Sequence, residues 1–140
     1  PLIFAAPEWL QVKAGAATES VAEFIDIYPT LCDLSGLPKP DHLQGTSLVP
    51  VLKDPAASVK EEAISRFKDG DTIRTAQYRY TIYSDQKGRQ TGHMLYDHAK
   101  DPDENINVAD DPEYAEVVAD LAKRLKAGMG RPGEFKPLKQ

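Results

Sequence analysis

The chain has 140 residues, of which 41% are hydrophobic and 28% are charged, and its formal net charge is −5. This length suits one modest domain and is too short for most two-domain enzymes. The acidic balance argues against a nucleic-acid or anionic-membrane partner, because both need clustered Lys and Arg. No stretch approaches the roughly 18 consecutive apolar residues of a membrane span.

The beginning of the chain predicts a strand separated from its sheet. Residues 2–5 are continuously apolar, as buried parallel strands are. The chain starts at Pro1 without an initiator Met, so we expect a fragment or a processed product. A strand without its neighbours can pair with a second copy, which predicts homo-oligomers formed through this segment.

A helix is predicted next, although two start signals compete for it. Ser20 and Glu23 have the spacing of a capping box, but Pro29 cannot lie deep in a helix that begins there. We therefore predict extended chain up to Asp26 as the N-cap and a helix over residues 27–35. Its expected buried stripe comprises Ile27, Tyr28, Leu31 and Leu34.

Gly36 is expected to end this helix, and a helical turn near residues 47–52 follows. A polar linker at residues 55–59 is the predicted internal boundary. Cys32, the single cysteine, allows neither an internal disulfide nor a zinc site built on paired cysteines. Its apolar surroundings favour a small buried hydrophobe over a nucleophile.

After residue 59 the hydrophobic period changes to two, which predicts an antiparallel sheet. Strands are expected at residues 63–67, 73–75, 78–83 and 93–96, with a turn at Gly70 and Asp71. Asp111 and Pro112 open a final helix that Gly128 should end. Its expected apolar stripe comprises Tyr114, Val117, Val118, Leu121 and Leu125. Residues 129–140 form a tail, and the predicted fold class is α+β.

The histidines and acidic segments match no catalytic or metal-binding motif. Residues 101–107 alternate Asp and Asn like a calcium loop, but Ile106 and Pro112 stand where an EF-hand needs Gly and Glu. We interpret the segment as an acidic turn. His93 and His98 are five residues apart, which puts them on opposite faces of a strand. We predict no catalytic residue and no metal ligand in this chain.

Two arginines and two tyrosines gather in one strand region of this acidic chain: Arg74, Tyr78, Arg79 and Tyr80. A planar guanidinium suits the oxygens of a carboxylate or a sulfate, and a tyrosine ring offers a stacking face to a sugar. These four residues are therefore the candidate substrate-binding site. Ordinary sheet packing, with each arginine paired to Asp or Glu, is the alternative.

Several short segments, taken in order, resemble the C-terminal half of type I sulfatases. They are residues 1–4, 26–31, 34–38 and 43–48. A second set is similar to the branch that includes iduronate-2-sulfatase and bacterial relatives: residues 73–75, 78–81, 95–97 and 101–107. The similarity covers roughly residues 1–128, and the order and spacing of the segments are more specific than any one of them.

The resemblance implies a fold and an activity. Residues 1–54 would end the large α/β sulfatase domain, and residues 55–128 would form the small subdomain with its antiparallel sheet and packed C-terminal helix. Such sulfatases hydrolyse sulfate esters of sugars with calcium and a formylglycine made in a C/S-x-P-x-R motif. Cys32 is not in that motif, so we expect both groups in the part before Pro1. A periplasmic or secreted location is also implied.

The leading hypothesis is therefore the C-terminal portion of an iduronate-2-sulfatase-like enzyme, inactive alone. Its partners would be the remainder of the catalytic domain and a sulfated sugar, with no nucleic acid and no membrane. The alternative is a stand-alone binding module for acidic or sulfated carbohydrate, which Arg74, Arg79 and their tyrosine neighbours motivate. A purely structural scaffold is the third hypothesis.

Overall fold

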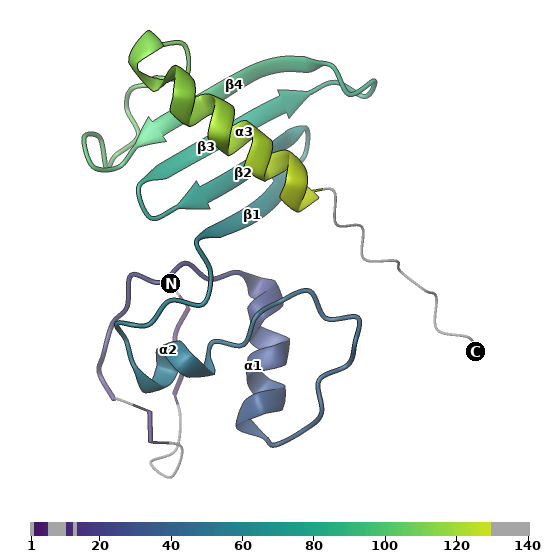
Figure 1. Ribbon diagram of the computed structural model, residues 1–140, viewed down its shortest axis with the longest axis vertical. Coiled ribbons are helices and arrows are strands. Elements are labelled where there is room, and N and C mark those ends of the chain that lie inside the picture. Colours follow the sequence, from purple (N-terminus) through teal and green to yellow (C-terminus); the bar gives the residue numbers. More distant parts are fainter. Residues whose placement is uncertain (1, 6–10, 13, 130–140) are drawn as a thin grey trace. The chain divides into compact units, whose positions relative to one another are not determined.

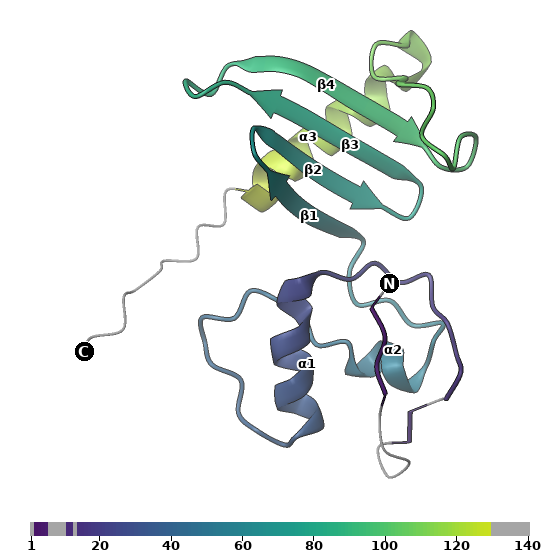
Figure 2. The same cartoon turned by 180° about the vertical axis from the view of Figure 1, so that it is seen from behind.

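The computed structural model describes residues 2–5, 11–12 and 14–129, and it divides the chain into two compact units, Pro1–Glu61 and Glu62–Gln140 (Figure 1). The first unit consists of short helices joined by irregular segments. The second is a four-stranded antiparallel sheet with one long helix across it, which Figure 2 shows from behind. The predicted α+β class is confirmed. In the described part of the chain, no helix is long and apolar enough to span a membrane.

The first helical segment joins a 3-10 helix, η2 (Phe24–Asp26), to an α-helix, α1 (Ile27–Leu34). α1 confirms the predicted helix to within one residue. The competing start signal, a capping box between Ser20 and Glu23, was set aside in the prediction and does not form, because Glu23 shares a capping box with Asp26 instead. The helical conformation therefore starts at Phe24, inside the stretch that was expected to be extended.

α1 ends in a Schellman motif. Gly36 has a left-handed φ of 65°, and its N–H donates to the Asp33 carbonyl at 3.3 Å. The Leu37 N–H donates to the Cys32 carbonyl at 2.9 Å. Gly36 thus ends the helix, as predicted. Cys32 is 4% exposed, which agrees with its interpretation as a small buried hydrophobe.

The carboxylate of Asp26 lies at the centre of the first unit. Asp26 is fully buried, and its Oδ1 accepts hydrogen bonds from the Thr46 N–H at 2.8 Å and the Lys60 ammonium at 2.7 Å. Its Oδ2 accepts the Glu23 N–H at 2.8 Å. Lys60 also pairs with the Glu23 carboxylate at 2.7 Å. One buried ion cluster therefore joins three segments that are far apart in the sequence.

A buried hydroxyl adds a second connection between two of these segments. Thr30 donates to the Asp26 carbonyl at 2.5 Å and accepts the Leu48 N–H at 2.8 Å. Gly45 lies against the Ile25 carbonyl, and a Cβ atom at Gly45 would come within 1.9 Å of that oxygen. These contacts hold residues 25–30 closely against residues 45–48. A short helix, α2 (Val49–Lys53), follows close to the predicted turn.

The prediction of a strand at residues 2–5 is wrong. Leu2 and Ile3 are 42% and 81% exposed, and the segment has no strand conformation. A strand needs a neighbour for its backbone groups. Among the described residues of the first unit, no strand is present to supply one.

The predicted buried stripe of α1 is wrong for Tyr28 and Leu31, whereas its other two residues, Ile27 and Leu34, are half-buried. Tyr28 and Leu31 are 53% and 50% exposed, whereas Pro29 and Thr30 on another face are buried. The physical reason is the pair of hydrogen bonds made by Thr30. These bonds turn a polar face inward, because a buried hydroxyl must keep its partners.

The second unit contains β1 (Glu62–Phe67), β2 (Gly70–Thr75), β3 (Tyr78–Ser84) and β4 (Gln90–Asp97). They lie in the order β1-β2-β3-β4, and each neighbouring pair is antiparallel, so all four predicted strands are confirmed. The turn between β1 and β2 is formed by Lys68 and Asp69, two residues earlier than the predicted Gly70 and Asp71. Gly70 belongs to β2, where the Tyr83 ring lies 3.0 Å from the position of a Cβ atom.

The 3-10 helix η3 (Pro112–Tyr114) and the α-helix α3 (Ala115–Met129) cover one face of the sheet (Figure 1). Asp111 caps them as predicted, because its carboxylate accepts the Glu113 N–H at 2.9 Å. The buried core comprises Ile73, Tyr80, Leu95, Ala109, Tyr114, Leu121 and Leu125. The prediction that Gly128 ends the helix is wrong. Gly128 lies inside α3, where a Cβ atom would come within 1.9 Å of Ile64 Cδ1, so its small size permits close packing on β1.

The acidic segment after β4 forms a turn, as predicted. The Asp101 carboxylate accepts the Ile106 N–H at 2.8 Å. The Leu95 N–H donates to Asn107 Oδ1 at 2.9 Å, and the Leu95 carbonyl accepts the Val108 N–H at 3.0 Å. The segment therefore continues the hydrogen bonding of β4.

Replacement of Asp26 by Ala should lower the free energy of unfolding of the first unit by about 3–5 kcal/mol, because it leaves the largely buried Lys60 ammonium without this partner. Hydrogen exchange of the Thr46 amide, followed by NMR, should accelerate in parallel. Asp33→Ala is the matched control, since Asp33 pairs with Lys39 near the surface. An equal loss of stability in both variants would contradict a central role for Asp26.

Asp97 makes the second unit sensitive to acid. Burial would raise the pKa of Asp97, but hydrogen bonds from Gln77 and Tyr114 and from the Ala99 N–H outweigh it and lower the pKa below 3.8. The unfolded chain therefore binds this proton more readily. The stability that the ionised Asp97 adds to the second unit is complete above the unfolded pKa of about 4. It is lost as the pH falls through the lowered pKa of the folded state.

Asp97→Asn should therefore flatten the fall in stability of the second unit below about pH 4. Urea unfolding at a series of acidic pH values, monitored by hydrogen exchange of β3 amides, measures this slope. Asp103→Asn is the control, because Asp103 is an exposed aspartate of the same unit. If the slope of the Asp97→Asn variant equals that of the unmodified chain, the assigned role of Asp97 is incorrect.

Candidate functional site

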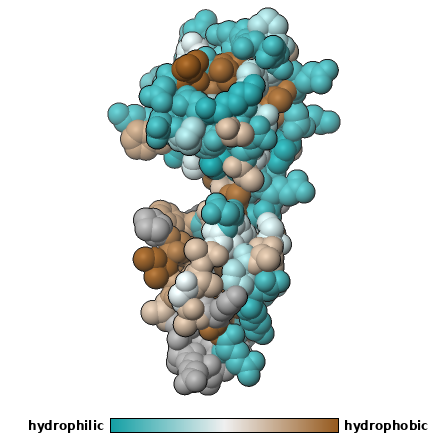
Figure 3. All heavy atoms as spheres, turned by 90° about the vertical axis from the view of Figure 1, so that its left-hand side faces the viewer, coloured by the Kyte–Doolittle hydropathy of each residue, from teal (hydrophilic) through white to brown (hydrophobic). Residues whose placement is uncertain are grey.

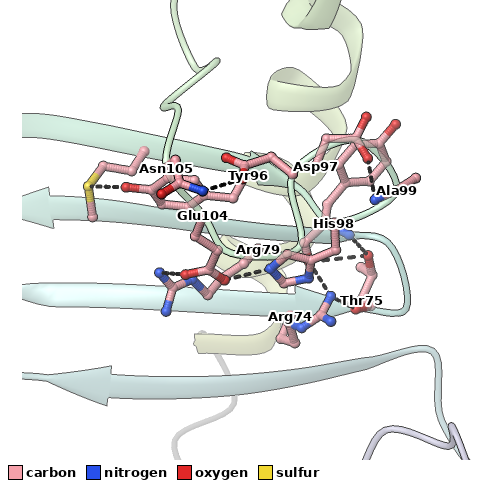
Figure 4. Close-up of polar contacts among 12 residues, drawn as sticks. Arg74, Thr75, Arg79, Tyr96, Asp97, His98, Ala99, Glu104 and Asn105 are labelled. Atoms are coloured by element: carbon pink, nitrogen blue, oxygen red, sulfur yellow. Dashed lines mark hydrogen bonds and ion pairs between the residues drawn. The ribbon is translucent and has the colours of Figure 1, made fainter.

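Two arginines face each other on the side of the sheet that α3 does not cover. Arg74 on β2 is the register partner of Arg79 on β3. Because side chains alternate along a strand, both point away from the face that carries Tyr80 and the core under α3. Figure 4 shows the polar contacts around the pair. Like charges that oppose each other across two strands destabilise a sheet unless other groups compensate them.

Glu104, in the turn after β4, supplies one compensating charge. Its carboxylate forms an ion pair with Arg79 Nη2 and lies 2.5 Å from His98 Nε2 (Figure 4). The backbone of Glu104 has a left-handed φ of 57°, an uncommon conformation for a residue other than glycine. The Arg79 guanidinium also lies 5.2 Å from the centre of the Tyr96 ring, within the range of a cation–π contact. These contacts fix Arg79 in the structure.

Arg74 differs from Arg79 because no carboxylate of the described residues pairs with it. Its Nη1 donates to the backbone carbonyls of Thr75, Ala76 and Tyr78, the latter two at 3.3 Å. Burial lowers the pKa of Arg74, Glu104 partly offsets this, and Arg79 lowers it further. Arg74 is therefore a partly buried cation, and within the described structure its Nε and Nη2 atoms donate no hydrogen bond.

The structure separates the two predicted tyrosines from the two arginines. Tyr80 is 2% exposed, and its hydroxyl contacts His93 Nδ1 at 3.1 Å. Tyr78 packs edge to face against Tyr114 with ring centres 6.5 Å apart. Both tyrosines lie on the side of α3. A sugar bound beside the arginines could therefore not stack on either ring.

Three residues that surround Arg79 are absent from the predicted site: Tyr96, His98 and Glu104. Tyr96 is the register partner of Arg79, so the pairing of β3 with β4 would have indicated it. Glu104 reaches the arginine through the conformation of its loop, for which the sequence holds no comparable signal. His93 and His98 lie apart as predicted, because His93 instead contacts Tyr80 and Asp110.

In the part of the chain that the structure describes, no three His, Cys, Asp or Glu side chains converge where a metal ion could bind. Asp101, which belongs to the calcium-like sequence, uses its carboxylate to accept bonds from Asn105 and from the Ile106 N–H. Calcium and formylglycine thus remain predictions about a longer parent protein.

Residues 1–130 match the family described as N-sulphoglucosamine sulphohydrolase, C-terminal. The chain belongs to this sulfatase family. A Delta 4,5-hexuronate-2-O-sulfatase of Bacteroides thetaiotaomicron is 34% identical over 129 residues, which cover 86% of this chain and 26% of that protein. Arylsulfatase K of Mus musculus is 31% identical over 147 residues, which cover 94% of this chain and 25% of that protein. The predicted relationship to sulfatases is confirmed.

A solved structure shares the fold of this sulfatase region. It was determined in complex with its substrate, D-glucosamine-2-N,6-O-disulfate, and superposes with a TM-score of 0.76 at 23% identity. The match covers 89% of this chain and 28% of that one. At this identity the likeness concerns the fold alone. The chain spans about a quarter of the length of the curated relatives that it matches.

Arg79→Gln should lower the free energy of unfolding of the second unit by about 1–2 kcal/mol, because it removes a charge-assisted bond to Glu104. Arg66→Gln is the matched control, since Arg66 pairs with Asp71 on the exposed part of β1. Urea unfolding of both variants measures the difference. Equal stability of the two variants would contradict the contribution of the Arg79–Glu104 ion pair to the stability of the second unit.

Proposed function

We propose that this chain is the C-terminal portion of a larger hydrolase that cleaves sulfate esters of sugars. The observation that carries the proposal is the family match over residues 1–130. The identity to a hexuronate-2-O-sulfatase supports a sulfated sugar as the substrate. A periplasmic or secreted location, where such sugars are met, is part of the proposal.

In this proposal the chain does not perform the chemistry itself. The 140 residues contain no C/S-x-P-x-R motif, and Cys32 is buried within α1. The nucleophile and the calcium ion would therefore belong to the remaining part of the parent protein. This chain would contribute a rigid sheet whose uncovered face carries fixed positive charge.

Arg74 is the residue of the predicted site best suited to contact the substrate. Its Nε and Nη2 atoms carry no hydrogen bond in the described structure, and no carboxylate pairs with it there. A guanidinium in this state favours a sulfate or carboxylate group, whose oxygens can accept two parallel bonds. Arg79 is less suited, because Glu104 already binds it. Tyr78 and Tyr80 would support the sheet rather than the sugar.

The same feature of Arg74 favours the second candidate function, a stand-alone module that binds acidic or sulfated carbohydrate. The two functions differ in what the chain does without a parent protein. A binding module would bind a sulfated disaccharide by itself, with an affinity that depends on Arg74. Isothermal titration of the 140-residue chain with that sugar separates the two.

The 140-residue chain should not hydrolyse 4-nitrophenyl sulfate, with or without added calcium, because the proposed nucleophile is not part of it. The product of the longer gene should hydrolyse this ester, and chelation of calcium should remove that activity. Calcium-dependent turnover by the 140-residue chain would contradict the proposal. Cys32→Ser is the control, because turnover that survives this change cannot arise from the cysteine.

In the longer gene product, Arg74→Gln should raise the KM for a sulfated sugar about three- to tenfold and leave kcat nearly unchanged, as expected for a binding contact. Arg66→Gln is the matched control from a neighbouring strand. A purely structural role predicts a lower melting temperature for Arg74→Gln with an unchanged KM. That result would remove Arg74 from the proposed binding site.

A further inference from the structure

The first unit exposes a row of large apolar side chains along η2 and α1. Phe24, Tyr28 and Leu31 are 87%, 53% and 50% exposed. Their spacings of four and three residues place them on one helix face. Ile25, at 50% exposure, and Leu37, at 61%, flank this face. We refer to these five residues as the α1 stripe.

The α1 stripe is part of a wider difference between the two units. Among the described residues, nine large hydrophobic side chains are exposed, and seven of them belong to the first unit, including Leu2 and Ile3. Figure 3 shows the same difference on one side of the molecule, where the second unit is mainly hydrophilic. Contiguous exposed apolar surface of this kind marks an interaction site.

The helix cannot simply rotate to bury the α1 stripe. Asp26 and Thr30 lie on a different face and are fully buried in polar contacts with Thr46, Lys60 and the Leu48 N–H. Turning Tyr28 inward would break these bonds and expose the buried carboxylate. The stripe is therefore held outward by the fold of the first unit itself.

We infer that the α1 stripe docks against an apolar face of the sulfatase domain that precedes this region in the relatives. The inference rests on the proposed function and names the surface through which the chain joins the rest of the enzyme. The chain spans about a quarter of those relatives, so most of the sulfatase fold is available to cover the stripe. The exposed apolar segment at residues 2–5 belongs to the same unit and fits the same occupant.

Cysteine labelling can test this inference because the native Cys32 is only 4% exposed and gives a low background. Phe24→Cys and Tyr28→Cys report on the stripe, and Glu116→Cys on the exposed side of α3 is the matched control. In the 140-residue chain, all three should react rapidly with a maleimide. In the longer gene product, both stripe cysteines should react at least about tenfold more slowly, whereas Glu116→Cys should not.

Three results would overturn the inference. The first is equal labelling of the stripe in the two proteins. The second is a gene that encodes no sulfatase domain before Pro1. The third is protection in the 140-residue chain that disappears on dilution, which would identify a second copy as the occupant. If a cysteine prevents folding, hydroxyl-radical footprinting of Phe24 and Leu31 in the unmodified proteins gives the same comparison.

The two proposals can fail separately. Sulfate ester hydrolysis is measured on the same longer protein that is used for labelling. A protected stripe without hydrolysis would contradict the proposed function and leave the docking surface intact. Hydrolysis with an unprotected stripe would contradict only the docking surface.

Discussion

A single buried carboxylate determines the architecture of the first unit. Asp26 is fully buried and holds Glu23, Thr46 and Lys60 through bonds of 2.7–2.8 Å. A charge in this position is tolerated only while every partner stays in place, since an unpaired buried carboxylate is strongly destabilising. The helix, the loop around Thr46 and the approach to the sheet are therefore fixed together. The apolar surface of α1 is open because this polar cluster occupies the inward side.

The second unit divides its chemistry between the two faces of one sheet. The face under α3 is closed by an apolar core, whereas the other face carries Arg74 and Arg79. On that face Glu104 compensates Arg79, and backbone carbonyls hold Arg74. The sheet thus holds Arg74 in a defined position with its Nε and Nη2 atoms unused within the described structure. This is the arrangement on which the proposal of a sulfate or carboxylate contact depends.

The parts of the fold that follow from local rules were predictable. The period-two pattern located four strands, and Asp111 with Pro112 located the start of the last helical segment. The buried face of α1 was not predictable, because it depends on bonds from Thr30 to a residue 18 positions away. The strand expected at residues 2–5 needs neighbours that the described structure does not contain.

Part of the error in the predicted site could have been found from the sequence alone. Strand alternation already placed Tyr78 and Tyr80 on one face of β3 and Arg79 on the other, so the four residues could not share one surface. The structure confirms this alternation. Glu104, by contrast, could not be assigned from its position in the sequence, because only the loop conformation with its φ of 57° brings it to Arg79.

The contact between the acidic turn and Leu95 has a consequence for association. β4 is an outer strand of the sheet, and its unpaired backbone groups would invite another strand to add there. Asn107 and Val108 occupy the N–H and the carbonyl of Leu95, so this edge is partly closed by the chain itself. The acidic turn therefore hinders edge-to-edge aggregation through β4, independently of any role of Glu104 beside the arginines.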